Sequence, residues 1–334
     1  FGIIPFSTVS VEVVDEMHVA VLGTPFGMKL YTEGVLVIDI TDVESENGKT
    51  SPGEAAGIKK GDYIISAEGK NIHTNEELSA AVEASGGNRI KLLIKRNGKK
   101  KTVYITPVTS KETGSLKIGL WVRDSSAGIG TMTFYSPYTG VVCGLGHGVC
   151  DEDTGELLSL ETGELVTAEI ISLEKGASGA PGQLKGKFTG NSIGAIDKNC
   201  ENGVYSILKG KINPSNLTEI ALKQEIKDGT AQILCTLEGN TPKLYECKIK
   251  KRSSAYLSSS QNLTVTVTDK ELLEKTGGIV QGMSGSPIIQ NGKLVGAVTH
   301  VLIDDPTSGY GIFAENMLKE AQTAAEENKL KNAS

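Results

Sequence analysis

The stretch GMSGSPIIQNGKLVGAVT, residues 282–299, decides the fold prediction. Glycines on both sides of Ser284 let the backbone turn sharply and leave the serine hydroxyl accessible. The apolar runs on either side of Asn291-Gly292 predict a β-hairpin that supports this turn. A serine on such a turn can attack a carbonyl if a base takes its proton and if backbone N–H groups face the oxyanion that forms. The N–H groups near Gly282 and Ser284 are the candidates for that oxyanion hole.

The pattern resembles the nucleophile loop of the chymotrypsin-like serine peptidases, G-x-S-G-x-P, which is followed by a hairpin and a substrate-binding strand. The resemblance implies a double β-barrel in which residues 297–301 form the edge along which substrate lies. An ordinary Gly/Ser turn is the alternative interpretation. A second G-x-S-G-x-P, residues 176–181, contains Ser178. No apolar strand and hairpin follow it, so the sequence favours Ser284.

The base is expected to be a histidine, because its pKa lies nearest to neutral pH. Of the four histidines, His18 and His73 lie in an N-terminal region with a different pattern. His300 follows the serine on a predicted strand, where a side chain more naturally lines a groove. His147 ends an apolar strand on a glycine turn and precedes the serine in the chain. A lone histidine is often structural, but the pairing with Ser284 favours His147 as the base.

A carboxylate is expected to orient this histidine. Asp151, Asp153, Asp197 and Asp269 are candidates. The chymotrypsin-like enzymes usually carry the acid in the first barrel, which favours Asp197. Asp269 ends an alternating strand shortly before the nucleophile. The residues alone leave the choice open.

A second motif is SPGEAAGIKKGDYIISAEGKNI, residues 51–72. Proline and glycine set its turns, a small apolar helical turn follows, and Gly61-Asp62 opens a strand. This stretch resembles PDZ domains. Upstream, Pro25-Phe26-Gly27-Met28 resembles the carboxylate-binding loop of that family, which implies that a peptide C-terminus binds there by strand addition. The alternative is a PDZ domain that packs on a neighbour and binds no free peptide.

The patterns predict a mainly β chain. We expect a lead-in at residues 1–15, a PDZ domain at 16–108, a polar linker at 109–117, a peptidase domain at 118–313 and a C-terminal surface helix and tail at 314–334. Thr74 and Glu77 form a predicted capping box for a helix at 75–84. A further helix is predicted at 217–227. Strands are predicted at 18–22, 34–40, 62–67, 89–95, 101–107, 118–123, 128–135, 140–145, 165–172, 194–196, 231–237, 243–249, 262–268, 286–290 and 294–302.

Composition excludes some classes of function. The net charge of −6 and the lack of a basic stripe argue against nucleic-acid binding, since Lys95–Lys101 is better explained as a hairpin turn with solvated lysines. No apolar run is long enough to span a membrane. The five cysteines match neither a dense disulfide framework nor a zinc site, and their pairing stays open. The chain starts at Phe1 without Met, so we expect an upstream signal or anchor.

Taken together, a PDZ motif, GHGVCD at 146–151 and TDKELLEKTGGIVQGMSGSP at 268–287 resemble the stage IV sporulation protein B peptidases of endospore-forming bacteria. That resemblance implies His147 and Ser284 as the catalytic pair and Asp269 as the acid, with no metal or cofactor. It also implies export from the forespore into the intermembrane space, self-cleavage, and cleavage of a membrane-anchored regulatory complex that triggers mother-cell sigma-factor processing. The alternatives are a non-catalytic PDZ adaptor and an HtrA-like quality-control protease.

Overall fold

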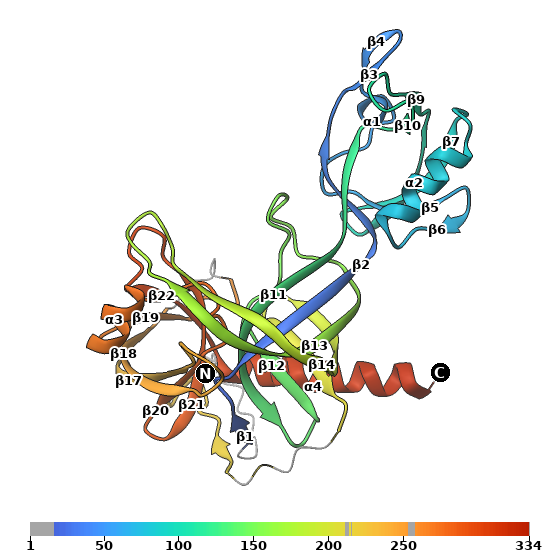
Figure 1. Ribbon diagram of the computed structural model, residues 1–334. Coiled ribbons are helices and arrows are strands. Elements are labelled where there is room, and N and C mark those ends of the chain that lie inside the picture. Colours follow the sequence, from blue (N-terminus) through green and yellow to red (C-terminus); the bar gives the residue numbers. More distant parts are fainter. Residues whose placement is uncertain (1–16, 211–213, 215, 253–257, 334) are drawn as a thin grey trace, which may run out of the picture.

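The computed structural model describes residues 17–210, 214, 216–252 and 258–333 of the chain. The expected lead-in, residues 1–15, lies outside the described residues. A smaller domain stands away from a larger body, and two long strands, β2 (Pro25–Ile40) and β11 (Leu120–Ser136), connect them (Figure 1). The two strands pair antiparallel from Leu120↔Ile40 to Thr131↔Pro25. Each therefore belongs to the small domain at one end and to the large body at the other.

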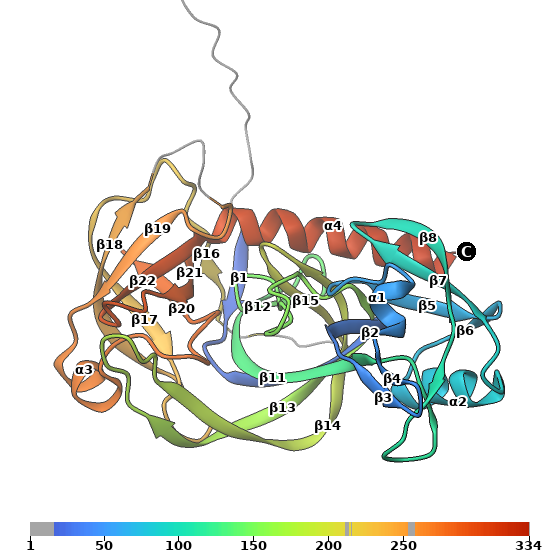
Figure 2. The same ribbon diagram turned by 90° about the horizontal axis from the view of Figure 1, so that it is seen from above.

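Half of the large body is a closed barrel of six strands, in the order β17-β18-β19-β22-β21-β20. Its inward-facing side chains alternate with outward-facing ones, as they do in β18 and β19, and form one apolar core. The short helix α3 (Lys270–Thr276) lies at the outer end of this barrel (Figures 1 and 2). The strands are β17 (Gly229–Cys235), β18 (Lys243–Lys251), β19 (Leu263–Val267), β20 (Pro287–Gln290), β21 (Lys293–Val301) and β22 (Ser308–Phe313).

The other half is part of a large sheet in which β1, β11, β12, β15, β14, β13 and β2 are neighbours. It contacts the closed barrel where the end of β12 meets the turn before β20. The tight approach of Gly285 to Thr131 and Leu145 marks that contact. The strands are β1 (His18–Val21), β12 (Val141–Gly144), β13 (Leu160–Glu174), β14 (Gln183–Cys200), β15 (Gly203–Leu208) and β16 (Thr218–Glu219).

The small domain has its own apolar core, which includes Ile64, Leu78 and Leu92. The predicted helix is α2 (Asn75–Ala84), and the predicted capping box is present: Thr74 Oγ1 accepts from Glu77 N–H at 3.2 Å. Residues 108–117 form a small hairpin rather than a structureless linker. The remaining elements are β3 (Val43–Ser45), β4 (Gly48–Thr50), α1 (Pro52–Ala55), β5 (Tyr63–Ala67), β6 (Lys70–Asn71), β7 (Ile90–Arg96), β8 (Lys99–Ile105), β9 (Val108–Thr109) and β10 (Leu116–Lys117).

The strand pairing crosses the expected domain boundaries on both sides. β1 pairs with β11 and β16, and the first half of β2 pairs with β11 and β13, so residues 18–32 belong to the large body. Conversely, Ile118, Leu120 and Val122 pack in the core of the small domain. Sequence patterns locate strands but not the distant strands with which they pair. The expected boundaries of the PDZ domain and of the peptidase domain therefore differ from those in the structure.

Two helix predictions need correction. The helix predicted at 217–227 is wrong: the Ile220 N–H donates to Met17 and the Ala221 N–H to Leu294, so these backbone groups pair with other segments instead of within a helix. The terminal helix exists as α4 (Ala314–Ala333), but it is no surface helix. Met317, Ala321 and Ala324 are fully buried and pack on the core beside β12. Its small apolar residues form one buried stripe among many polar ones, and Figure 2 shows the helix running along the body.

Candidate active site

The Ser284 turn is held open by glycines. Gly282 and Gly285 have φ of +96° and +94°, in the left-handed region that favours glycine. A Cβ on Gly285 would lie 2.0 Å from the Thr131 carbonyl oxygen and 2.6 Å from the Leu145 nitrogen. No side chain fits there. The two glycines therefore allow the serine loop to press against the strands of the neighbouring sheet.

Strand β11 fixes the serine loop by three hydrogen bonds. The Thr131 N–H donates to the Ser284 carbonyl at 2.9 Å, and the Thr131 hydroxyl donates to the Gly282 carbonyl at 2.9 Å. The buried Thr133 hydroxyl donates to the Gly285 carbonyl at 2.7 Å. These bonds hold carbonyl groups inward.

The N–H groups at the predicted oxyanion positions are those of the turn that have no hydrogen-bond acceptor among the described residues. Gly285 N–H donates to Val298 at 2.7 Å, and Met283 N–H donates to Val280 at 3.1 Å. Within the described part of the chain, no hydrogen bond uses the N–H of Gly282 or of Ser284. Two donors without partners on one glycine turn are what an oxyanion requires.

His147 follows β12 on a partly buried turn. Its Nδ1 lies 2.8 Å from the Gly148 carbonyl oxygen. A carbonyl can only accept, so the proton of the neutral ring is assigned to Nδ1 and the lone pair to Nε2. Burial lowers the pKa of His147, and the Gly148 carbonyl offsets only part of that effect. At neutral pH the ring is therefore in the form that can accept a proton.

Ser284 and His147 each have a contact with the end of β21. The Ser284 hydroxyl donates to the Thr299 carbonyl at 2.6 Å. The next residue, His300, has its ring centroid 4.5 Å from that of His147, with the planes tilted by 35°. Leu145, two residues before His147, contacts the serine loop at Gly285. Residues from three separate segments thus gather at the junction of the barrel and the sheet. In this state the serine hydroxyl points to a carbonyl, and rotation about its χ1 would redirect it.

Asp269 is the N-cap of α3. Its Oδ1 accepts from Leu272 N–H at 3.0 Å and its Oδ2 from Glu246 N–H at 3.3 Å. α3 lies at the outer end of the barrel, whereas β12, which leads to His147, lies in the middle of the molecule (Figures 1 and 2). Among the described residues no hydrogen bond or ion pair joins Asp269 to His147. The structure gives this aspartate a capping position and does not bring it into the cluster of Ser284 and His147.

The other acid candidates also have partners elsewhere. Asp197 lies on β14 and faces α4, where its Oδ1 is 3.2 Å from Lys331 Nζ and accepts from Asn328 at 3.2 Å. Asp153 is 2.7 Å from the Arg123 guanidinium. Asp151 forms the centre of a separate network. None of the three is joined to His147 by a contact within the described residues.

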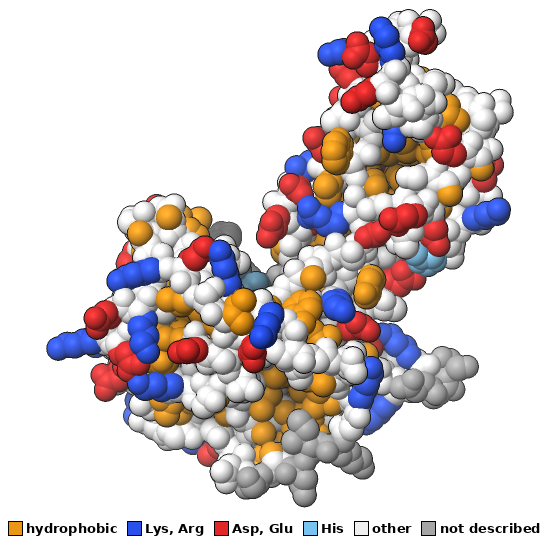
Figure 3. All heavy atoms as spheres, viewed as in Figure 1, with side chains coloured by type: hydrophobic (Ala, Val, Ile, Leu, Met, Phe, Trp, Pro, Cys, Tyr) orange, Lys and Arg blue, Asp and Glu red, His pale blue; other side chains and the backbone are white. Residues whose placement is uncertain are grey.

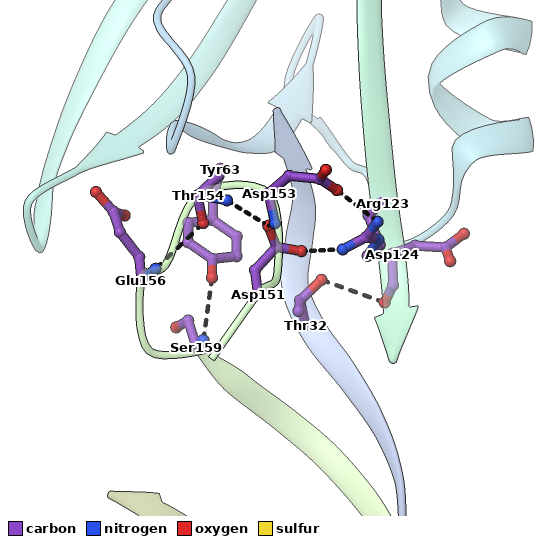
Figure 4. A network of polar contacts seen from close by, with 9 residues as sticks. All are labelled: Thr32, Tyr63, Arg123, Asp124, Asp151, Asp153, Thr154, Glu156 and Ser159. Carbon is purple, nitrogen blue, oxygen red and sulfur yellow. Dashed lines mark hydrogen bonds and ion pairs between the residues drawn. The ribbon is translucent and has the colours of Figure 1, made fainter. Parts of the chain in front are cut away.

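The Asp151 network ties the histidine loop to the connecting strands (Figure 4). The carboxylate of Asp151 is fully enclosed and forms an ion pair with Arg123 on β11. Its other oxygen accepts from the N–H groups of Asp153 and Thr154 at 3.0 and 2.9 Å. Burial acts to raise the pKa of Asp151, but the Thr154 N–H and Arg123 outweigh it, and the pKa lies below its usual value. The carboxylate is therefore charged and held.

The same loop contacts the small domain. The Tyr63 hydroxyl, on β5, accepts from the Ser159 N–H at 3.1 Å (Figure 4). Lys95 Nζ donates to the Ser159 hydroxyl at 3.2 Å and pairs with Glu33 at 2.6 Å. The segment that follows His147 thus contacts both the connecting strand β11 and the small domain. These residues carried no motif that sequence reasoning could have found.

The remaining serine and histidine candidates lie elsewhere. Ser178 is exposed at a turn between β13 and β14, and its hydroxyl donates to the Asp304 carbonyl at 2.9 Å. His18 pairs with Glu219 in the β1–β16 ladder. His73 lies before α2, where a hydrogen bond with Glu161 raises its pKa.

The predicted carboxylate-binding loop, Pro25-Phe26-Gly27-Met28, is wrong. All four residues are buried in β2 and pair with β11 on one edge, and Phe26, Gly27 and Met28 also pair with β13 on the other edge. A strand paired on both edges has no free N–H groups for a carboxylate. These residues are part of a central strand of the large body.

A groove of about 480 Å³ in the small domain was missed. Leu78 and Val82 of α2 line one wall, and residues 116–122 line the other. The β11 edge at 120–122 that faces α2 pairs with no strand among the described residues, while its other edge pairs with β2. Figure 3 shows hydrophobic side chains on this face of the domain. Gly119, with φ of +66°, lies at the start of that edge and could have been recognised as the glycine of a K-I-G-L-W loop.

The fold and the site define a class. A serine on a glycine turn and a neutral histidine that both contact the end of β21, in a β body joined to a PDZ domain, fit a PDZ-containing serine peptidase. The chain belongs to the SpoIVB peptidase S55 family, whose model matches residues 114–318, and a PDZ domain model matches residues 10–106. None of the helices among the described residues has the length and apolar character needed to cross a membrane.

Curated relatives match over a shorter stretch. A putative zinc metalloprotease of Clostridium acetobutylicum is 33% identical over 101 residues, which cover 30% of this chain and 28% of that protein. A putative zinc metalloprotease of Neisseria meningitidis is 34% identical over 101 residues, covering 29% and 23%. The chain thus spans less than a third of the length of these relatives.

Solved structures resemble parts of the chain. The HtrA-type protease AlgW with decapeptide has a TM-score of 0.35 and 11% identity, covering 61% of this chain and 55% of that one. Rv3671c from Mycobacterium tuberculosis, as an inactive Ser-to-Ala mutant, has a TM-score of 0.30 and 13% identity, covering 58% and 82%. The PDZ domain of an SdrC-like protein from Listeria monocytogenes has a TM-score of 0.23 and 21% identity, covering 27% and 87%.

Proposed function

We propose that the chain is a serine endopeptidase of chymotrypsin-like double-barrel type in which Ser284 is the nucleophile and His147 the general base. Two contacts at neighbouring residues of β21 support the proposal. The Ser284 hydroxyl donates to the Thr299 carbonyl, and the ring of the next residue, His300, contacts the ring of His147. The closed six-stranded barrel supplies one barrel of that fold, and the sheet around β11, β12 and β13 would supply the other.

The reaction follows from these positions. The Ser284 hydroxyl turns away from the Thr299 carbonyl as substrate binds, and Nε2 of His147 takes its proton while Oγ attacks the peptide carbonyl carbon. The N–H groups of Gly282 and Ser284 stabilise the oxyanion. His147 then returns the proton to the leaving amine, and the C–N bond breaks. Water, activated by the same histidine, attacks the acyl-enzyme and releases the acid.

The substrate is proposed to lie along β21. Gly285 N–H and Val298 N–H bond the serine loop to β21 up to Val298, at 2.7 and 2.9 Å. Beyond that point the strand diverges from the loop, and Thr299 and His300 face the catalytic cluster. An extended peptide added here would place its carbonyl near Ser284.

The acid remains a hypothesis. The family resemblance nominates Asp269, and the N-cap position of that residue favours a structural role instead. Near-normal kcat in Asp269→Asn, after correction for the folded fraction, would remove it from the mechanism. The same measurement on Asp197→Asn tests the alternative acid.

The biological role is proposed from the family alone. A SpoIVB-type peptidase would be exported from the forespore into the intermembrane space, would cleave itself and a membrane-anchored regulatory complex, and would thereby trigger mother-cell sigma-factor processing. The PDZ domain would hold a peptide tail in the groove between α2 and β11. Ser79→Lys places a charge on the exposed side of α2 that lines that groove, and weaker binding of a C-terminal peptide library with unchanged cleavage of a short peptide would support this placement.

The test of the enzyme is cleavage by the purified chain and by Ser284→Ala. We expect self-cleavage and peptide hydrolysis to fall by about 10³-fold or more in the variant, since the nucleophile is lost. Undiminished cleavage would refute the role of Ser284. Equal folding but no cleavage in either protein would favour the adaptor, and comparable cleavage of many unfolded proteins would favour an HtrA-like protease.

A further inference from the structure

His300 is in contact with the proposed base but has no role in the mechanism above. It lies near the end of β21, one residue after the carbonyl that accepts the Ser284 hydroxyl. Its ring stacks on His147 with centroids 4.5 Å apart and a tilt of 35°. The residue is exposed to solvent, and its ring contacts that of His147. The contact is therefore a defined packing of two rings.

The His147 ring has few other constraints. Its Nδ1 is fixed by the carbonyl of the very next residue, Gly148, at 2.8 Å, which anchors the edge of the ring but not its plane. Asp269, Asp197 and Asp151 have partners elsewhere, so no carboxylate among the described residues holds the ring from behind. A second contact is needed to fix the plane, and His300 supplies one.

Only one of the two rings, that of His147 or that of His300, is expected to carry a proton charge at a time. Surrounding protein and the neighbouring His147 lower the pKa of His300 to about 4. No charged group acts on His147, and His147 is the one titratable group acting on His300 within the described residues. The nearby Cys150 sulfur, 3.9 Å from the Gly148 carbonyl, is a neutral thiol because burial raises its pKa. When His147 takes the serine proton, a neutral aromatic ring lies against the imidazolium.

We propose that His300 is a positioning residue for the general base: its neutral ring holds the His147 imidazole in plane, keeps water from one face of it, and lies against the imidazolium formed during attack. This proposal rests on the proposed function. A neutral ring against a cation is favourable, whereas a second cation at this distance is not. The role differs from substrate lining, because it acts on the protonation of His147.

The test compares His300→Phe with His300→Ala in the pH dependence of kcat/KM for a peptide. Activity requires neutral His147, so it is lost as the pH falls through the pKa of that residue. His300→Ala exposes the ring to water, which raises this pKa. We expect the acid limb to move to higher pH and kcat to fall roughly tenfold with a smaller change in KM. His300→Phe keeps an aromatic ring at this position, so kcat and KM should stay within about threefold of the parent values and the acid limb should not move.

A second measurement separates this proposal from the enzyme assignment. In chains carrying Ser284→Ala, the imidazole of His147 is titrated by NMR with and without His300→Ala. An upward shift of its pKa on loss of the ring supports the positioning role, whether or not the parent chain cleaves peptides. Unchanged acid limbs and an unchanged His147 titration in both His300 variants would overturn it. An absence of Ser284-dependent cleavage would refute the enzyme assignment instead.

Discussion

The ion pair between Arg123 and Asp151 should be the most sensitive polar contact of the large body. The Asp151 side chain is 0% exposed and the Arg123 side chain 32% exposed. Arg123→Met keeps the length of the side chain but leaves the buried carboxylate without its cation. Breaking a buried pair in this way costs about 3–5 kcal/mol. Because Arg123 is one-third exposed, we expect a loss of about 3 kcal/mol in the free energy of unfolding.

Two further variants test whether the unpaired buried carboxylate causes this loss of stability. Asp151→Asn leaves a solvated arginine and a neutral side chain that can still accept from Thr154, so it should cost less than Arg123→Met. The double variant should be more stable than Arg123→Met alone, since no buried charge is left. Urea unfolding followed by circular dichroism at pH 7 gives all three values. Three variants within about 0.5 kcal/mol of the parent chain would refute the reasoning.

The pH dependence provides a second check. The pKa of Asp151 is lowered in the folded chain, so its contribution is present above the unfolded pKa and is lost as the pH falls through the folded pKa. Without Arg123 the carboxyl should take up a proton at higher pH. The gap between Arg123→Met and the parent chain should therefore narrow on acidification. A gap that widens would contradict this account of the ion pair.

Two further predictions concern the backbone. Gly285→Ala should abolish cleavage and lower stability by several kcal/mol, since its Cβ would lie 2.0 Å from the Thr131 carbonyl oxygen; normal activity and an unchanged unfolding curve would contradict the tight approach. Thr74→Ala removes the side-chain acceptor of the α2 capping box and should cost about 1 kcal/mol in urea unfolding, with unchanged peptide hydrolysis. Thr74→Ser is its matched control.

Local patterns predicted the elements whose structure depends on near neighbours. Thr74 and Glu77 mark the start of α2, and the glycines around Ser284 mark a sharp turn, because caps and left-handed glycines act within a few residues. The Asn291-Gly292 hairpin was likewise found. The α3 cap was missed although Asp269 precedes a helical run that ends at Gly277, because the segment had been assigned to the end of a strand.

The features that the sequence did not predict depend on pairing between segments far apart in the chain. Pro25–Met28 is an apolar segment in both interpretations, and only its pairing with β11 and β13 places it in the large body. The stacking of His300 on His147 likewise joins residues more than 150 positions apart. No spacing in the sequence reveals such a contact.

Covalent labelling tests the central claim most directly. The intact chain is treated with a fluorophosphonate probe and analysed by peptide mass spectrometry, beside Ser284→Ala and His147→Ala. We expect about one probe per chain on Ser284 in the parent protein, none in Ser284→Ala, and a rate at least 100-fold lower in His147→Ala. Labelling of Ser284 at an undiminished rate without His147, or of another serine in its place, would contradict the pairing of these two residues.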